Sequence, residues 1–293
     1  MAKRQFDILT DSCADMGEAY YEKNGVDVVR LGFTMNNVNY GGEDGEKIAL
    51  KDFYEKLRGG AMPTTYQVTG ESAKEHMESH LNAGRDLLVL SFSSGLSGTH
   101  GSYVVAARAL KEKYPDRKIF VVDSLCACMG EGLLLDYLVR KADEGATIEE
   151  ARDYLEEIKL KICHHFTVDS LFHLKRGGRV SGVTAIVGSI LKIKPVMHVD
   201  DNGKLTVVGK CMGRRKALAT LVENMMATQE VGENDPVYIA HADCIADAEG
   251  LKMMVLERLP KAQVTIGEIG AVIGSHAGSG TIALFNIGTT RNV

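Results

Sequence analysis

The feature that most constrains this chain is a series of short, uninterrupted apolar runs in its first half, separated by stretches of helical character. Leu87 to Leu90 and Ile119 to Val122 are examples. Strands that are apolar on both faces are typical of a parallel sheet covered by helices on both sides. This half is therefore predicted to be doubly wound. Its expected strands are 6–9, 26–33, 87–90 and 119–122, and its expected helices are one ending near residue 20 and those at 50–57, 70–83, 99–114 and 129–144.

The pattern changes after a helix predicted over 148–160, for which Thr147 and Glu150 form a capping box. Beyond it, short strands return through tight turns such as 201–203, which is typical of an antiparallel sheet with helices on one side. The expected strands are 167–171, 195–198, 204–210, 237–241 and 263–269, and the expected helices lie near 214–228 and 246–258.

The length of 293 residues favours two domains. We predict an α/β protein in which an N-terminal, doubly wound, mainly parallel sheet domain covers residues 1–165. A C-terminal α+β domain with a mainly antiparallel sheet is expected to cover residues 166–293.

Charge and apolar content exclude several partners. The net charge of −5 supplies no basic stripe for nucleic acid. No stretch approaches the roughly 18 uncharged apolar residues of a membrane span, and 183–199 is interrupted by Lys192 and Lys194. The first residues do not have the pattern of a signal peptide, so a cytoplasmic location with reduced cysteines is expected. Only Cys126 and Cys128 lie close together, so we expect no metal ion.

The strongest local signal is the segment 91–99, set between a predicted strand and a predicted helix. It holds several small hydroxyl residues, including Ser93, Ser94 and Ser97, together with two glycines. Hydroxyls and free N–H groups at such a helix start bind anions, and ligands of open α/β sheets sit at this edge. Helix capping alone would need only one hydroxyl, so we favour an anion site.

Three other segments carry weaker signals. Thr64 and Thr65 precede the helix at 70–83, where capping by Thr69 is the alternative explanation. His276 lies in the glycine-rich segment 274–280, predicted as a loop, and can donate to a carboxylate as its own pKa rises; a flexible turn is the alternative. Arg179 follows paired glycines and suits the recognition of an acidic group, or else is a solvated surface residue.

Enzyme signatures are missing from the sequence. It contains no GxSxG, GxxxxGK[ST] or GxGxxG pattern. Asp11-Ser12 after the first strand is faintly similar to a phosphatase nucleophile, but Ala14 stands where the partner acid is needed. We therefore predict no catalytic residues and no cofactor.

Taken in order, these segments resemble the DegV family of bacterial fatty-acid-binding proteins. The similarity covers essentially the whole chain and rests on 10–12, 63–67, 93–99, 174–181, 191–196 and 276–280.

The resemblance implies one long-chain fatty acid enclosed between two domains, with Thr65 and Ser94 on its carboxylate and His276 nearby. It places Thr64, Ser93, Ser97 and Arg179 in support. It further implies a carrier that presents the acid to a separate ATP-dependent fatty-acid kinase, which forms an acyl phosphate for phospholipid synthesis.

The acyl tail needs an apolar tunnel, worth about 0.8 kcal/mol per buried methylene. Candidate walls, each of which is equally compatible with ordinary core, are Phe33, Ile186, Val187, Ile190, Leu191 and Leu284.

Three positions depart from the family pattern. Tyr66 replaces a small hydroxyl, and Ser279 replaces a proline. Met212 stands where the family commonly has an arginine associated with the kinase, a role left open to Arg214 or Arg215. Two alternatives therefore remain beside the carrier: a lipid buffer without a kinase partner, and a hydrolase or transferase of acyl or phosphoryl groups that uses His276 as its base.

Overall fold

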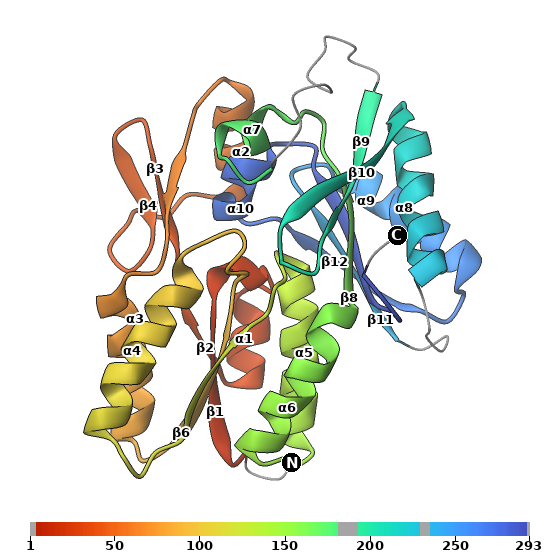
Figure 1. The fold of residues 1–293 in the computed structure, drawn as a ribbon. Helices are drawn as coiled ribbons and strands as arrows, with labels where there is room; N and C mark the ends of the chain where they lie inside the picture. The colour runs from red at the N-terminus through yellow and green to blue at the C-terminus, as the bar shows by residue number, and fades with distance from the viewer. Residues whose placement is uncertain (1–3, 181–192, 229–234, 292–293) are drawn as a thin grey trace.

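The computed structural model describes residues 4–180, 193–228 and 235–291. Figure 1 shows two sheet-based halves side by side, the N-terminal half running from red to light green and the C-terminal half from green to blue. The predicted fold class is confirmed in both halves. None of the described helices is long and apolar enough to cross a membrane.

The N-terminal half is built on a parallel sheet with the strand order β2-β1-β6-β7. Alternate residues of these strands face opposite helix layers, as Leu9 and Val89 do on one side and Ile8 and Leu88 on the other. The strands are β1 (Phe6–Asp11), β2 (Val26–Val29), β6 (Asp86–Ser91) and β7 (Ile119–Asp123). The helices are α1 (Glu18–Asn24), α3 (Gly70–Asn82), α4 (Thr99–Lys113), α5 (Met129–Asp143) and α6 (Ile148–Ile158).

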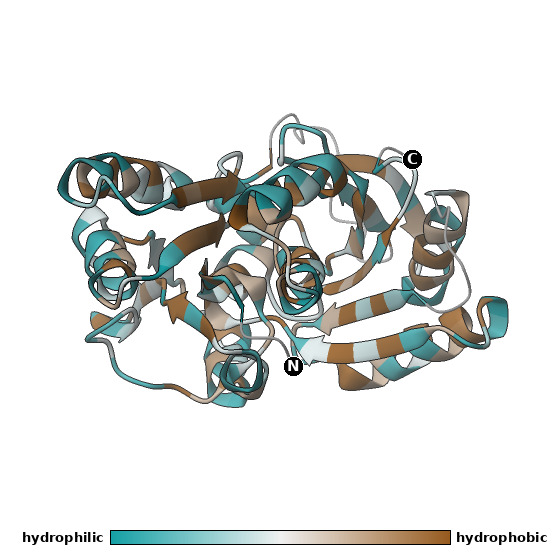
Figure 2. Cartoon of the chain, turned by 90° about the horizontal axis from the view of Figure 1, so that it is seen from below, coloured by the Kyte–Doolittle hydropathy of each residue, from teal (hydrophilic) through white to brown (hydrophobic). Residues whose placement is uncertain are grey.

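Helices α3 and α4 cover one face of this sheet, and α1, α5 and α6 cover the other. In Figure 2 the apolar positions, in brown, follow the strands and the helix faces turned toward them. The predicted capping box of α6 is confirmed, because Thr147 Oγ1 accepts from the Glu150 amide at 3.3 Å and Glu150 Oε2 accepts from the Thr147 amide at 2.8 Å.

The C-terminal half is a six-stranded sheet with the order β10-β9-β8-β13-β11-β12. Its neighbouring strands are antiparallel except for β11 and β12. The strands are β8 (Ile162–Thr167), β9 (Ile193–Val199), β10 (Leu205–Met212), β11 (Pro236–His241), β12 (Gln263–Glu268) and β13 (Ile282–Ile287). Helices α8 (Arg214–Thr228) and α9 (Ile245–Arg258) cover its outer face, while α5 lies against its inner face.

The remaining elements are shorter, and among them the sequence pattern predicted only the helix expected over 50–57. A small antiparallel sheet is formed by β3 (Gly32–Met35), β4 (Val38–Gly41) and β5 (Thr64–Tyr66), and it lies near α2 (Leu50–Arg58), α7 (Phe172–Arg176) and α10 (Ala271–Ala277). Two 3-10 turns, η1 (Ser12–Ala14) and η2 (Lys159–Lys161), complete the described elements.

Three local predictions were wrong. The strand expected over 26–33 is divided into β2 and β3, which belong to different sheets, because the chain turns away at Arg30 and Leu31. The strand expected over 167–171 is instead β8, whose consecutive His164 and His165 are buried polar residues and hide the apolar pattern. The expected loop over 274–280 begins inside helix α10. Strand β8 starts at Ile162, within the domain expected to end at 165.

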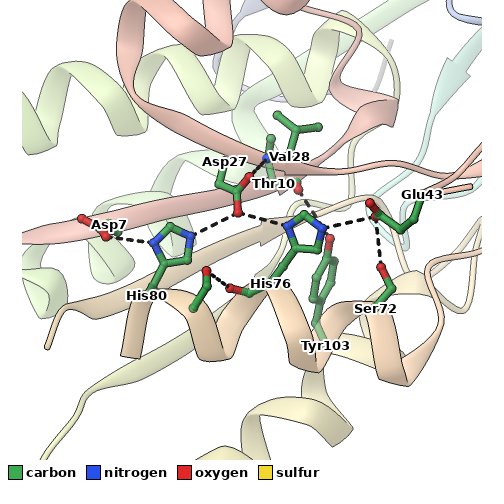
Figure 3. A network of polar contacts seen from close by, with 10 residues as sticks. Asp7, Thr10, Asp27, Val28, Glu43, Ser72, His76, His80 and Tyr103 are labelled. Carbon is green, nitrogen blue, oxygen red and sulfur yellow. Dashed lines mark hydrogen bonds and ion pairs between the residues drawn. The ribbon is translucent and has the colours of Figure 1, made fainter. Parts of the chain in front are cut away.

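Helix α3 is tied to the parallel sheet by an alternating chain of acids and histidines (Figure 3). Asp27 Oδ2 lies 3.1 Å from His76 Nδ1 and 3.2 Å from His80 Nε2. The outer ring nitrogens reach two more carboxylates, at 3.2 Å for Glu43 and 2.8 Å for Asp7. The bond to Asp27 raises the pKa of His76. Burial opposes this for His80, but its bonds to Asp27 and Asp7 outweigh burial, and its pKa is raised as well.

Raised histidine pKa values predict a loss of stability in alkali. A group whose folded pKa exceeds its unfolded value near 6.5 stabilises the fold fully below that value and loses this effect as pH rises through the folded pKa. Because these side chains are partly exposed, we expect a contribution of about 1 kcal/mol in all. Denaturant unfolding of wild type and of His76→Gln/His80→Gln should give free energies that converge between about pH 6 and pH 9. A constant difference would contradict the ion-pair chain.

Candidate ligand-binding site

A cavity of about 340 Å³ lies between the two halves of the protein. The volume is at the lower end of the roughly 300–1,000 Å³ typical of small-molecule sites. Its wall is mostly apolar and is drawn from both halves. The main apolar lining residues are Leu31, Phe92, Leu96, Phe166, Leu174, Val199, Leu205, Ile269, Val272, Ile273, Ala283 and Phe285.

Strand alternation explains which residues of β13 reach the cavity. Ala283 and Phe285 line it, whereas Leu284 between them faces α8 and α9 on the outer side of the sheet. Phe33 is packed in the core against Tyr40 and Phe53. Two of the six expected tunnel walls are thus ordinary core. The other four, at 186, 187, 190 and 191, lie outside the described residues.

Thr65 and His276 meet at the polar part of the cavity. Thr65 is on β5 of the small sheet and His276 is on α10, and their side chains approach to 2.7 Å between Oγ1 and Nε2. These two predicted site residues come from opposite halves of the chain. The imidazole packs closely against Gly177, where a Cβ atom would come within 2.2 Å of His276 Nδ1. Gly177, the first of the paired glycines before Arg179, is therefore required for this close approach.

His276 is neutral at physiological pH in this environment. Burial lowers its pKa to about 4, and the nearby cations of Arg179 and Arg176 act in the same direction. A neutral ring that donates its Nε2–H to Thr65 leaves the threonine O–H free to donate elsewhere. In this arrangement His276 donates to Thr65, and the Thr65 hydroxyl in turn can donate to a ligand.

Arg179 brings a cation to the same wall. Its Nε donates to the carbonyl of Leu96 at 3.1 Å and its Nη1 donates to the carbonyl of Gly177 at 2.5 Å. Both acceptors are neutral, and Arg179 takes part in none of the ion pairs formed within the described part of the chain. A guanidinium held in this way has charge available for an anionic ligand.

The hydroxyl-rich segment contributes Ser97 to the cavity. Ser97 Oγ lies 3.0 Å from Thr99 Oγ1 and accepts from the Thr99 amide, which fixes the hydroxyl at the start of α4.

Ser94, expected to hold a carboxylate, is exposed and does not belong to the described wall; its amide donates to Asp123. Ser93 is fully buried, and its hydroxyl instead donates to the carbonyl of Gly203 at 2.8 Å. Thr64 is exposed on the strand face opposite Thr65. Because the segment turns between Ser93 and Ser97, only the later serine faces the cavity.

Two of the unusual residues have clear structural settings. The ring of Tyr66 covers Gly32, where a Cβ atom would come within 2.2 Å of the ring. The absence of a side chain at Gly32 therefore provides the space for the bulky phenol. Met212 is 60% exposed at the end of β10. Arg214 beside it is already engaged, since its Nε donates to Asp247 at 2.9 Å.

Comparison with known proteins places this architecture in one family. The family model described as "Uncharacterised protein, DegV family" matches residues 5–289. A DegV domain-containing protein of Clostridium perfringens is 41% identical over 98% of this chain and 99% of its own length. Another, from Lactococcus lactis, is 32% identical over 96% of this chain and 97% of its own.

Two solved structures are similar in fold. One, described as fatty acid binding of a DegV family protein from Thermus thermophilus, has a TM-score of 0.87 with 29% identity over 98% of this chain and all of that one. A stearic acid-binding protein from Eubacterium ventriosum also has a TM-score of 0.87, with 27% identity over 97% of this chain and 98% of that one. The sequence segments, the two-sheet architecture and these matches together show that the chain belongs to the DegV family.

Proposed function

We propose that this protein binds a long-chain fatty acid in the cavity between its halves, with the carboxylate at Thr65. The observation that carries the proposal is a polar cluster of Thr65, His276, Ser97 and Arg179 on the wall of an otherwise apolar cavity. The Thermus thermophilus protein, described as fatty acid binding, and the Eubacterium ventriosum protein, described as stearic acid-binding, support the choice of ligand.

The chemistry of the cluster suits a carboxylate. The Thr65 hydroxyl donates to the head group while it accepts from His276, and Arg179 supplies the counter-charge. Hydrogen bonds to an ionised acceptor are about twice as strong as neutral ones, and more so where water is excluded. In this proposal Ser97 takes the place that the family resemblance assigns to Ser94, because Ser97 and not Ser94 lines the described wall.

The apolar wall suits an acyl chain. Each methylene that leaves water gains about 0.8 kcal/mol, so a long chain is held mainly by its tail and oriented by its head. The thiols of Cys13 and Cys128, which also line the cavity, add little polarity, because burial raises both of their pKa values and keeps them neutral.

The protein is then a carrier, and catalysis belongs to a partner. We propose that it presents the acid to a separate ATP-dependent fatty-acid kinase for phospholipid synthesis. Because Met212 is exposed and Arg214 is held by Asp247, we propose Arg215 as the cation of this segment that meets the partner. Incubation of the loaded carrier with a purified fatty-acid kinase and ATP distinguishes this role from that of a lipid buffer, since only a kinase-linked carrier yields acyl phosphate.

A hydrolase that uses His276 as its base is less well supported. The 2.7 Å contact of His276 with Thr65 is within the range for a nucleophile and its base. However, a pKa of about 4 makes this imidazole a weak base, and its Nδ1 has no orienting partner among the described residues.

The first test of the proposal is the identity of the co-purified ligand. Native mass spectrometry of protein purified without added lipid should show a mass increase that matches one fatty acid, released on denaturation and identified by chromatography. Protein without any bound lipid that also fails to take up added fatty acid would contradict the proposal.

Removal of the clamp hydroxyls tests the head-group assignment. We expect Thr65→Val to weaken fatty-acid binding about tenfold or more, since a hydrogen bond to a charged group is lost, and Ser97→Ala to weaken it less. Ser94→Ala is the matched control from the same segment and should bind as wild type does. Equal losses for Ser94→Ala and Ser97→Ala, measured by competition with a fluorescent fatty acid, would contradict the assignment.

Replacement of Arg179 tests the source of the counter-charge. Because Arg179 helps to hold the pKa of His276 at about 4, Arg179→Gln should raise that pKa and also weaken fatty-acid binding. An NMR pH titration of the imidazole in the unliganded protein measures the first effect. An unchanged His276 pKa would mean that the guanidinium does not act on this cluster.

A further inference from the structure

Helix α10 connects the proposed carboxylate clamp to a second contact between the halves. It carries His276 near its C-terminal end, where Thr65 holds the ring. At its other end, the amide of Gly270, the residue before the helix, donates to Asp15 Oδ1 at 3.1 Å. Six residues of helix correspond to about 9 Å. One short, rigid element thus joins the Asp15 contact to the His276 contact.

The fit around this contact is unusually close. A Cβ atom at Gly270 would come within 2.5 Å of Asp15 Oδ1, and one at Gly274 would come within 2.5 Å of the Tyr54 hydroxyl. Tyr54 also donates to the carbonyl of Ile269 at 2.7 Å. The N-terminal half therefore holds the start of α10 at consecutive residues, and the two glycines remove the side chains that would keep the surfaces apart.

Asp15 is held in an uncommon conformation at this point. Its φ angle of 51° and ψ angle of 34° lie in the left-handed region, which costs a non-glycine residue free energy and persists only where the surroundings enforce it. The backbone is fixed by the Asp15 amide, which donates to Ser12. This conformation aims the carboxylate across the interface at Gly270.

We infer that Asp15 is a positioning residue for the carboxylate clamp, and that its contact with Gly270 sets α10 so that His276 reaches Thr65. The inference rests on the proposed function, because it assigns Asp15 a role in holding the fatty-acid head group. Asp15 itself does not line the cavity within the described part of the chain, so its effect on binding passes through the helix.

The surroundings of Asp15 make its charge state responsive to pH. Burial raises its pKa to about 7, while a hydrogen bond from the Cys128 thiol and the bond from the Gly270 amide oppose the rise. No cation compensates among its described neighbours. The titratable groups that face it from η1, β1, α1, α2 and α5 are Cys13, Asp11, Tyr21, Tyr54, Cys128 and Glu131. Above this pKa the ionised carboxylate is the stronger acceptor for Gly270, and below it the contact weakens.

The test compares the affinity of Asp15→Asn and of wild type for cis-parinaric acid, a fluorescent long-chain fatty acid. Asparagine keeps the shape and an acceptor oxygen but removes the charge. We expect binding about fivefold weaker than wild type at about pH 8, and affinities within about twofold of each other at about pH 6, where wild-type Asp15 is protonated. His276, with its pKa of about 4, remains neutral throughout this range.

Two further variants make the result specific. Glu131→Gln removes another buried acid of the same cluster, one that contacts Thr10 and not α10, and should bind like wild type. Thr65→Val reports on the clamp itself. Thermal unfolding confirms that each variant is folded.

The possible outcomes distinguish the role of Asp15 from the proposed function of the cavity. Equal affinity of Asp15→Asn and wild type at about pH 8, with Thr65→Val still weakened, overturns the role of Asp15 and leaves the proposed function standing. A loss that is the same at both pH values, or that Glu131→Gln reproduces, overturns it as well, because it would reflect general packing. Unchanged binding by Thr65→Val overturns the clamp and this inference with it.

Discussion

The structure depends on polar contacts that cross between two halves which otherwise meet through apolar side chains. A buried backbone group without a partner costs about as much as a lost hydrogen bond, so an interface that encloses a cavity must satisfy every such group locally. Each of three carbonyls receives a hydrogen bond from a side chain of the other half: Gly203 from Ser93, Ile269 from Tyr54, and Leu96 from Arg179. Next to the Ser93–Gly203 contact, the fully buried Arg291 donates to the carbonyls of Leu125 and Asp200. These contacts fix the distance between the sheets and thereby the width of the cavity.

The same requirement explains the chemistry of the cavity wall. Polar side chains that are already committed to the interface, such as Ser93, are not available to a ligand, whereas Thr65, Ser97 and Arg179 line the cavity. A neutral histidine is the appropriate partner for such a threonine, because a charged ring would carry a high desolvation cost when the cavity is empty or holds only an acyl chain. The charge needed for an acid head is thus left to Arg179.

The sequence predicted the layers of the fold far better than the details of the site. Apolar runs such as 87–90 and 119–122 mark the parallel sheet because burial on both faces leaves a direct trace in composition. The same reasoning wrongly predicted β2 and β3 as one strand, because an apolar run does not show where the chain passes from one sheet to another. Within the hydroxyl-rich segment, nothing in the order of serines indicates that Ser97, and not Ser94, turns inward, because that depends on the turn geometry between them. The role of Asp15 was beyond reach for a similar reason: its partner Gly270 is 255 residues away along the chain and has no side chain to leave a signal.

In several contacts between the halves the acceptor is a main-chain oxygen, unlike the Asp15 carboxylate that accepts from Gly270. Gly203, Ile269, Leu96 and Leu125 all accept through their carbonyls, and Pro63 does the same for Arg176. At Ile269, Leu96 and Leu125 the contact is therefore insensitive to which amino acid occupies the accepting position, provided that the backbone path is kept. Gly203 is the exception, because a Cβ atom there would come within 2.1 Å of Ser93 Oγ. Substitution of the side chain of Leu96 or Ile269, both of which line the cavity, would therefore reshape the cavity wall for a different acyl chain and leave the contact between the two halves in place.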